Sequence, residues 1–160
     1  MKLGLISAIL GDLSFEEMID FLAECGLECV EVACWPKGKA ERRYAGVSHI
    51  DVDTLDDEKC AHILDYCQKK GVEISSLAYY PNTMDPDVEK RTAYIEHLHK
   101  LIDASAKLGV NMITTFIGRD PKKTVSQNLE LVKEIWPPIL DHAKEKGVKV
   151  AIENCQMLFT

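Results

Sequence analysis

The sequence contains no apolar run approaching the roughly 20 residues that a transmembrane helix needs. Positive charge is also scarce: the 160 residues carry a formal net charge of −7 at pH 7. A nucleic-acid backbone and an anionic membrane surface would both repel such a chain. We therefore predict neither nucleic acid nor a membrane as a partner.

Paired cysteine motifs and phosphate-binding motifs are missing as well. None of the six cysteines forms a C-x-x-C pair, which predicts reduced thiols and a cytoplasmic protein. No G-x-G-x-x-G follows the first predicted strand, and the segment 118–121 is not a P-loop. There is no linker or low-complexity segment, so residues 1–160 are predicted to form a single domain.

What the sequence does contain is a repeat marked by glycine. A helical pattern, a glycine and a short β-rich run occur together four times, at Gly26, Gly71, Gly109 and Gly147. These glycines are 45, 38 and 38 residues apart. Glycine just past a helix adopts the left-handed conformation at little steric cost. A near-constant period holding one helix and one strand is typical of βα repeats and a parallel sheet.

The repeat predicts five strands and four helices. The expected strands are Lys2–Ser7, Glu28–Ala33, Glu73–Ala78, Asn111–Phe116 and Val148–Asn154. The expected helices are Ser14–Cys25, Thr54–Lys70, Asp87–Leu108 and Thr124–Lys146. Ser14 and Glu17 predict a capping box, Asp85 is expected to cap the third helix, and Pro137-Pro138 should break or kink the fourth.

Five parallel strands are compatible with two α/β architectures. They complete an open doubly wound sheet, whereas a (β/α)8 TIM barrel needs about 250 residues to close. Only six residues follow Val148–Asn154, so the last strand lacks the covering helix that an open sheet would want. The sequence therefore favours a partial (β/α)8 barrel that is truncated after strand 5, with the open sheet as the alternative.

Two acidic residues interrupt strands that should be apolar, because both faces of a parallel sheet are normally covered. Glu31 and Glu153 each lie near the carboxyl end of a predicted strand, where barrels place their active sites. A buried, unpaired carboxylate is costly, so each is expected to face a metal or a polar cavity. An ion pair that serves folding alone is the alternative, above all for Glu31.

The segment Val150–Asn154 resembles the fifth-strand motif of the xylose-isomerase-like barrel superfamily. Segments 26–32 and 71–75 resemble its second-strand and third-strand motifs, and the likeness stays in register from the first strand to the fifth. Among members of this superfamily, the chain most resembles the bacterial proteins called sugar phosphate isomerase/epimerase. Trp35-Pro36 and the loop 42–46 also resemble segments of those proteins.

The resemblance implies that Glu153 is both a metal ligand and a catalytic proton carrier. The family's other ligands are Asp, His and Glu from strands six to eight, a set that suits Mn²⁺, Mg²⁺ or Co²⁺, with Zn²⁺ as a further candidate. The implied reaction is isomerisation or epimerisation of a sugar or sugar phosphate through an enediolate. Residues 1–160 alone are expected to have little activity, because one carboxylate holds a divalent ion weakly.

Further candidate residues follow the ends of the predicted strands. The candidates for substrate binding are Glu31, Trp35, His49, Tyr79, Tyr80, Asn82, Arg119 and Asn154. Trp35 could stack on a sugar ring, and Arg119, like Arg42 and Arg43, could hold a phosphate or carboxylate. The alternatives are packing beneath a loop for Trp35 and solvation for the arginines.

Two other functions are weighed. An endonuclease IV-like phosphodiesterase is disfavoured because no histidine ends the third or fourth strand, at residues 78–80 and 115–117. A non-catalytic half-barrel or open-sheet binding module would need its sheet edges covered by a partner or a second copy. We also expect a homo-oligomer.

Overall fold

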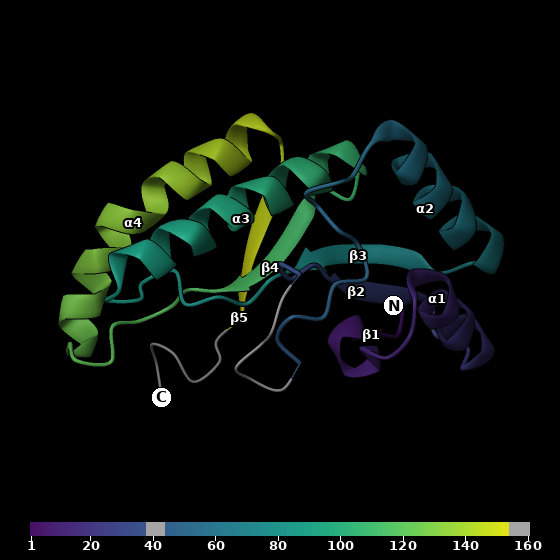
Figure 1. Ribbon diagram of the computed structural model, residues 1–160, viewed down its shortest axis with the longest axis horizontal. Coiled ribbons are helices and arrows are strands. Elements are labelled where there is room, and N and C mark those ends of the chain that lie inside the picture. Colours follow the sequence, from purple (N-terminus) through teal and green to yellow (C-terminus); the bar gives the residue numbers. More distant parts are fainter. Residues whose placement is uncertain (38–43, 154–160) are drawn as a thin grey trace. The chain divides into compact units, whose positions relative to one another are not determined.

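The structure is a computed structural model that describes residues 1–37 and 44–153. Over these residues, five strands alternate with helices (Figure 1). The strands are β1 (Gly4–Ile6), β2 (Cys29–Ala33), β3 (Glu73–Ala78), β4 (Met112–Phe116) and β5 (Lys149–Glu153). The helices are the 3-10 helix η1 (Ser7–Leu10), α1 (Phe15–Glu24), α2 (Asp57–Lys70), α3 (Val88–Lys107) and α4 (Val125–Glu145). The order of these elements along the chain confirms the predicted alternation.

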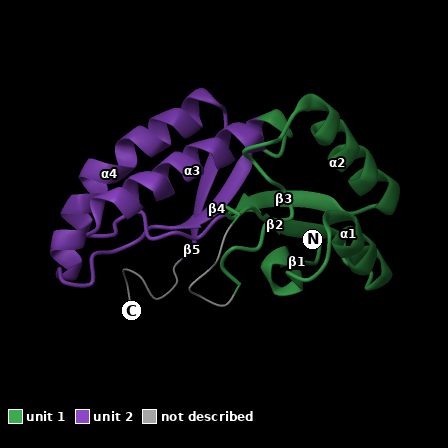
Figure 2. Ribbon diagram, viewed as in Figure 1, with its two compact units in different colours: residues 1–78, 107–110 green, residues 79–106, 111–160 purple. Residues whose placement is uncertain are grey.

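The chain divides into two compact units (Figure 2). The first unit comprises residues 1–78 and 107–110, and its strands β1, β2 and β3 pair in parallel. The second comprises residues 79–106 and 111–160, and its strands β4 and β5 also pair in parallel. Each unit therefore contains its own parallel strands and the helices that return the chain between them.

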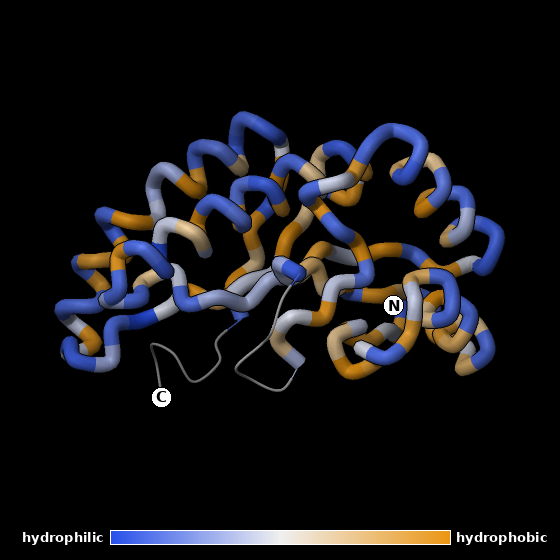
Figure 3. The backbone as a smooth tube through the Cα atoms, viewed as in Figure 1, coloured by the Kyte–Doolittle hydropathy of each residue, from blue (hydrophilic) through white to orange (hydrophobic). Residues whose placement is uncertain are grey.

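Each unit has its own apolar core. In the first, Met18, Ile19 and Leu22 of α1 are fully buried, as is Val30 of β2. In the second, the buried side chains come from α3, β4 and α4, and α3 lies beside α4 (Figure 1). Hydropathy alternates along the helices, as expected for helices that bury one face (Figure 3). No helix within the described ranges is both long and apolar enough to cross a membrane.

The predicted boundaries agree with the observed ones to within three residues. The largest difference is at α2, which begins at Asp57 rather than Thr54 because the side chain of Asp56 accepts a hydrogen bond from the N–H of Lys59 at 2.8 Å. The four repeat glycines have φ between 68° and 71°, which confirms their predicted left-handed conformation.

The predicted helix caps are partly confirmed. Ser14 and Glu17 form the expected capping box at α1. The prediction for Asp85 is wrong, because Asp87 accepts from the first-turn N–H groups of α3 at 3.1 and 3.3 Å. Asp85 instead accepts from the N–H of Asp87 at 2.9 Å, so it shapes the turn before the helix.

Of the two predicted effects of Pro137-Pro138, a break in the fourth helix does not occur, since α4 runs from Val125 to Glu145 with both prolines inside it. Both prolines are exposed, so water can hydrogen-bond to the carbonyl groups that lose their helical partners. Their neighbours Trp136 and Ile139 are buried, and the indole N–H of Trp136 donates to the carbonyl of Ile117 at 3.0 Å. The packing of Trp136 and Ile139 therefore keeps α4 continuous across the two prolines.

Neighbouring residues beyond the prolines test this packing. Ile139 is fully buried whereas Leu140 is 46% exposed. Ile139→Ala is expected to lower the free energy of unfolding by about 2–5 kcal/mol, and Leu140→Ala by less than about 1 kcal/mol. Urea denaturation of both variants measures the difference. Equal losses would show that α4 does not pack through its C-terminal half as described.

Candidate active site

In the first unit, polar side chains gather at the carboxyl ends of β1, β2 and β3. Ser7 directly follows β1, and its buried Oγ accepts a hydrogen bond from the N–H of Ala33 at 2.8 Å. Glu31 of β2 is half-buried, and the hydroxyl of Ser76 in β3 donates to its Oε2 at 3.3 Å. Glu31 is thus less buried than predicted.

His49 belongs to the same cluster. Its Nδ1 lies 3.0 Å from Ser7 Oγ, its Nε2 lies 3.3 Å from the carbonyl oxygen of Leu10, and its backbone N–H donates to Ala33. The Nε2 atom must donate to that carbonyl, which leaves Nδ1 to accept the hydroxyl proton of Ser7. Burial lowers the pKa of His49, although bonds to backbone carbonyls oppose the shift. A neutral His49 therefore ties its loop to the ends of β1 and β2.

Trp35 belongs to a segment that pairs with the segment containing this histidine. Its backbone N–H donates to the carbonyl of Val47 at 3.1 Å, and the preceding residue forms an antiparallel bridge with Ser48. The Trp35 side chain is half-buried. The segment after β2 is thus paired with the segment 47–49, and this pairing places Trp35 and His49 at the same end of the sheet.

In the second unit, two tyrosines follow β3 but differ in exposure. Tyr79 is only 1% exposed, and its ring packs edge-on against His97 of α3 at 4.7 Å between centroids. Tyr80 is half-buried, and its ring centroid lies 4.5 Å from that of Phe116 at the end of β4. Tyr80 is therefore the more accessible of the two to a ligand.

Asn82 and Arg119 meet as neighbours in the loops after β3 and β4. The amide of Asn82 donates to the carbonyl of Arg119 at 2.9 Å and accepts from its N–H at 2.8 Å. Asn82 thus fixes the backbone of Arg119, whose side chain is half-buried.

Glu153 is the last residue of β5 and pairs in register with Phe116 of β4. The prediction that it is buried is wrong: Glu153 is exposed, and its neighbour Ile152 is 46% exposed. The reason is that β5 is the last strand in the sheet order of the described residues, so nothing covers its outer edge. Asn154, Arg42 and Arg43 lie outside the described residues.

The described side chains do not form a metal site by themselves. Across residues 1–37 and 44–153 there is no group of three or more His, Cys, Asp or Glu side chains that could hold an ion. Glu153 offers the oxygen ligand that Mn²⁺, Mg²⁺ or Co²⁺ would take, but only one. A metal at this position would need further ligands.

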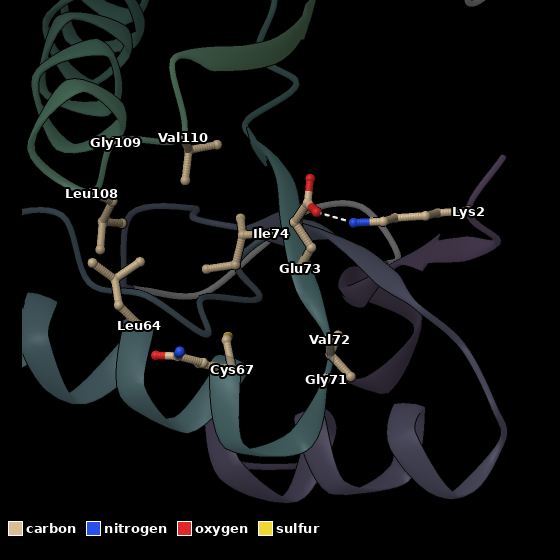
Figure 4. Close-up of a pocket in the computed structure, with 11 residues that line it drawn as sticks. Lys2, Leu64, Cys67, Gly71, Val72, Glu73, Ile74, Leu108, Gly109 and Val110 are labelled. Carbon is tan, nitrogen blue, oxygen red and sulfur yellow. Dashed lines mark hydrogen bonds and ion pairs between the residues drawn. The ribbon is translucent and has the colours of Figure 1, made fainter.

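A separate pocket of about 470 Å³ lies at the opposite, amino-terminal ends of the strands of the first unit (Figure 4). Apolar side chains such as Leu64 and Ile74 line it, and Lys2 forms an ion pair with Glu73 beside them. Burial raises the pKa of the Cys67 thiol in this pocket to about 11, so the thiol is protonated and unreactive at neutral pH. This pocket has no feature of an active site.

Sequence reasoning missed three residues that organise the carboxyl ends. Ser7 hydrogen-bonds to His49, and Ser76 hydrogen-bonds to Glu31. Asn128 of α4 hydrogen-bonds to the backbone of Asp120. A signal was available for Ser7, a small polar residue that follows an apolar strand. Asn128 looked like an ordinary helix residue, and only its burial, with 1% exposure, reveals its role.

The chain is similar to known proteins in both sequence and fold. The family described as "Xylose isomerase-like TIM barrel" matches residues 19–160. Curated protein sequences gave no match. Many solved structures share the fold, and the chain spans about half the length of each of those described below.

D-Psicose 3-epimerase with D-tagatose from Clostridium cellulolyticum H10 is 18% identical with a TM-score of 0.69, over 95% of this chain and 52% of that one. The probable 3-DHS dehydratase AsbF from Bacillus anthracis is 19% identical with a TM-score of 0.69, over 98% and 53%. The IOLI protein with a binding zinc atom is 17% identical with a TM-score of 0.66, over 95% and 51%. At these identities the similarity establishes the fold.

The lowered pKa of His49 gives stability a defined pH dependence. Between the ordinary pKa of about 6.5 and the lower folded value, the unfolded chain binds more protons than the folded one. The contribution of His49 is therefore complete above pH 6.5 and is lost as the pH falls toward the folded pKa, by at most about 1.4 kcal/mol per pH unit. A direct measurement is NMR titration of the His49 ring, with Ser7→Ala expected to raise its pKa. An ordinary pKa in the unmodified protein would contradict the buried geometry.

Proposed function

Because the chain belongs to the xylose isomerase-like TIM barrel family, we propose that it supplies the first five strands of a divalent-metal-dependent sugar isomerase or epimerase. Its fold is a partial (β/α)8 barrel, and residues 1–160 are proposed to form a single incomplete domain of it. The observation that carries the proposal is the position of Glu153. It ends β5 beside Phe116, at the carboxyl edge where barrels carry out their chemistry.

The proposed reaction is proton transfer at the carbon next to a sugar carbonyl. Glu153 removes or returns that proton, and the resulting enediolate is reprotonated to give the isomer. A divalent ion, held by Glu153 together with ligands that the described residues do not supply, would polarise the sugar oxygens. Tyr80 and Trp35 are proposed to pack against the sugar, because both are half-buried aromatic side chains at carboxyl ends of strands.

The proposed substrate is a ketose or its phosphate. Two neighbours support a ketose, since one is D-psicose 3-epimerase with D-tagatose and another is D-psicose 3-epimerase in the presence of D-fructose. Glu31, His49, Tyr79, Asn82, Arg119 and Asn154 remain proposed as residues that bind the substrate or shape its pocket. We also propose a cytoplasmic homo-oligomer whose ion is Mn²⁺, Mg²⁺ or Co²⁺, with Zn²⁺ supported by the zinc-bound IOLI neighbour.

The proposal predicts the effect of Glu153→Gln in the protein that contains the complete barrel. Loss of the proton carrier is expected to lower kcat for ketose epimerisation by about 10²- to 10⁴-fold. Glu145→Gln, an exposed change at the end of α4, is the matched control and should leave kcat unchanged. An unchanged kcat in Glu153→Gln would remove Glu153 from the chemistry.

The 160-residue chain alone gives a second test of the same residue. With a single carboxylate at the site, it is expected to bind Mn²⁺ or Co²⁺ only weakly in calorimetric titrations. Tight binding that disappears in Glu153→Gln would show that these residues already hold a complete metal site, contrary to the proposal.

A non-catalytic binding module is the second candidate. The observation that favours it is the outer edge of β5, which no other strand of residues 1–37 and 44–153 pairs with and where Ile152 is 46% exposed. A partner or second copy could pair with this edge. Analytical ultracentrifugation separates the candidates: a discrete dimer with one cooperative thermal transition supports the module, and concentration-dependent aggregation supports the incomplete enzyme.

A further inference from the structure

The loop after β4 is held at two consecutive residues by two asparagine side chains. At Arg119, the amide of Asn82 accepts from the N–H at 2.8 Å and donates to the carbonyl at 2.9 Å. At Asp120, the amide of Asn128 accepts from the N–H at 2.7 Å and donates to the carbonyl at 3.1 Å. Each amide thus satisfies both polar groups of one residue, as a neighbouring strand would.

The two asparagines come from different elements of the second unit. Asn82 lies in the loop after β3, whereas Asn128 lies in α4 and is 1% exposed. The amide nitrogen of Asn128 also lies within hydrogen-bond distance of the carbonyls of Lys123 and Thr124, at 3.2 and 3.1 Å. The backbone around Arg119 is therefore fixed to the loop after β3 on one side and to α4 on the other.

Close contact at Gly118 adds to this constraint. Gly118 has a φ of 79°, and a Cβ at this position would lie 2.8 Å from both Asn82 Oδ1 and the backbone nitrogen of Met84. Any other residue would clash with the turn at 82–84 and strain its own backbone. The glycine therefore permits the approach that lets Asn82 reach Arg119.

Entry into α4 does not require these contacts. The helix has its own complete capping box, in which Thr124 and Gln127 satisfy each other's N–H groups. The amide of Asn82 instead fixes the backbone of Arg119, three residues past the end of β4, and the amide of Asn128 fixes that of Asp120, the next residue. Fixing the backbone of one residue from both sides limits where its side chain can reach.

Charge around this residue favours an anionic ligand. The loop carries Arg119, Lys122 and Lys123 against a single acid, Asp120, in a chain whose net charge is −7. Asp120 lies 3.8 Å from Lys123 Nζ and accepts from the N–H of Lys122. Arg119 forms no ion pair with any carboxylate in the part of the chain that the structure describes. Its guanidinium is thus available for a phosphate or carboxylate, which it can bind through two parallel hydrogen bonds.

We propose that Arg119 binds an anionic group of the substrate, either a phosphate or a carboxylate, and that Asn82 and Asn128 position it. The inference rests on the proposed function and narrows its substrate class from sugars in general to anionic sugars. Asn82 and Asn128 act through the backbone of the loop and are positioning residues, whereas Arg119 makes the contact.

The test compares three probes at fixed ionic strength in NMR titrations of the ¹⁵N-labelled protein that contains the complete barrel: D-fructose 6-phosphate, D-gluconate and D-fructose. An anionic sugar should shift the backbone amide signals of residues 118–120 and bind more tightly than D-fructose. Arg119→Gln is expected to lower the affinity for the anionic sugar at least about tenfold and to leave the affinity for D-fructose unchanged. Arg119→Lys should recover part of the lost affinity. The anionic group is identified by which probe binds more tightly, the phosphate of D-fructose 6-phosphate or the carboxylate of D-gluconate.

Two further variants separate the effect of the position of Arg119 from the effect of the charge of its loop. Lys122→Gln removes an exposed charge from the same loop and should change the affinity for the anionic sugar by less than about twofold. Asn82→Ala, with folding checked by its amide spectrum, should lower that affinity several-fold although the charge is intact.

Four outcomes would overturn the inference. Equal losses for D-fructose and the anionic sugars in Arg119→Gln would mean that Arg119 serves folding. If Lys122→Gln and Arg119→Gln lowered the affinity for the anionic sugar equally, the loop would attract anions only through its overall charge, without a specific contact from Arg119. Binding of D-fructose without any advantage for an anionic sugar would refute the inference while leaving the proposed function intact, and failure of all three sugars would count against both.

Discussion

Parallel strand pairing is the constraint on which the rest of this structure depends. In a parallel pair both strands enter the sheet from the same edge, so each must be followed by a helix that carries the chain back. In the first unit the register joins Gly4 to Cys29 and Cys29 to Glu73; in the second it joins Met112 to Lys149. Each unit consequently places the residues that follow its strands at one edge, and the helix-ending glycines at the other. In barrels this arrangement separates the residues that carry out the chemistry from those that stabilise the fold.

The fold was largely predictable because its signals are local. A helix ending in glycine, a capping box and an apolar strand each lie within a few residues, and the boundaries agreed to within three. The errors occurred where a distant contact overrides a local preference. Pro137-Pro138 was predicted to break or kink its helix, but burial of the neighbouring Trp136 and Ile139 keeps α4 continuous. Two aspartates competed for the cap of α3, and only the backbone geometry shows that Asp87 takes it.

The candidate residues could be chosen from the sequence, but their contacts could not. The rule that active sites lie past the carboxyl ends of strands is enough to make His49, Asn82 and Arg119 candidates. Their partners could not be foreseen, because the bond from Ser7 to His49 spans 42 residues and those from Asn82 to Arg119 span 37. The burial of Glu153 was misjudged for a related reason: burial depends on what lies beyond β5, and no pattern within a strand records that.

Fold similarity at 17–19% identity does not select a reaction, since an epimerase and a probable dehydratase share this architecture. The selection must come from side chains at the carboxyl edge, and the second unit places two opposite charges there. Glu153 is in register with Phe116, whereas Arg119 follows Phe116 by three residues, a reach of at most about 10 Å along the chain. The proposed proton carrier at the strand end and the proposed anion contact beyond it would together suit a substrate that carries its charge away from its reacting carbon. A ketose that is phosphorylated or oxidised at its far end has that form.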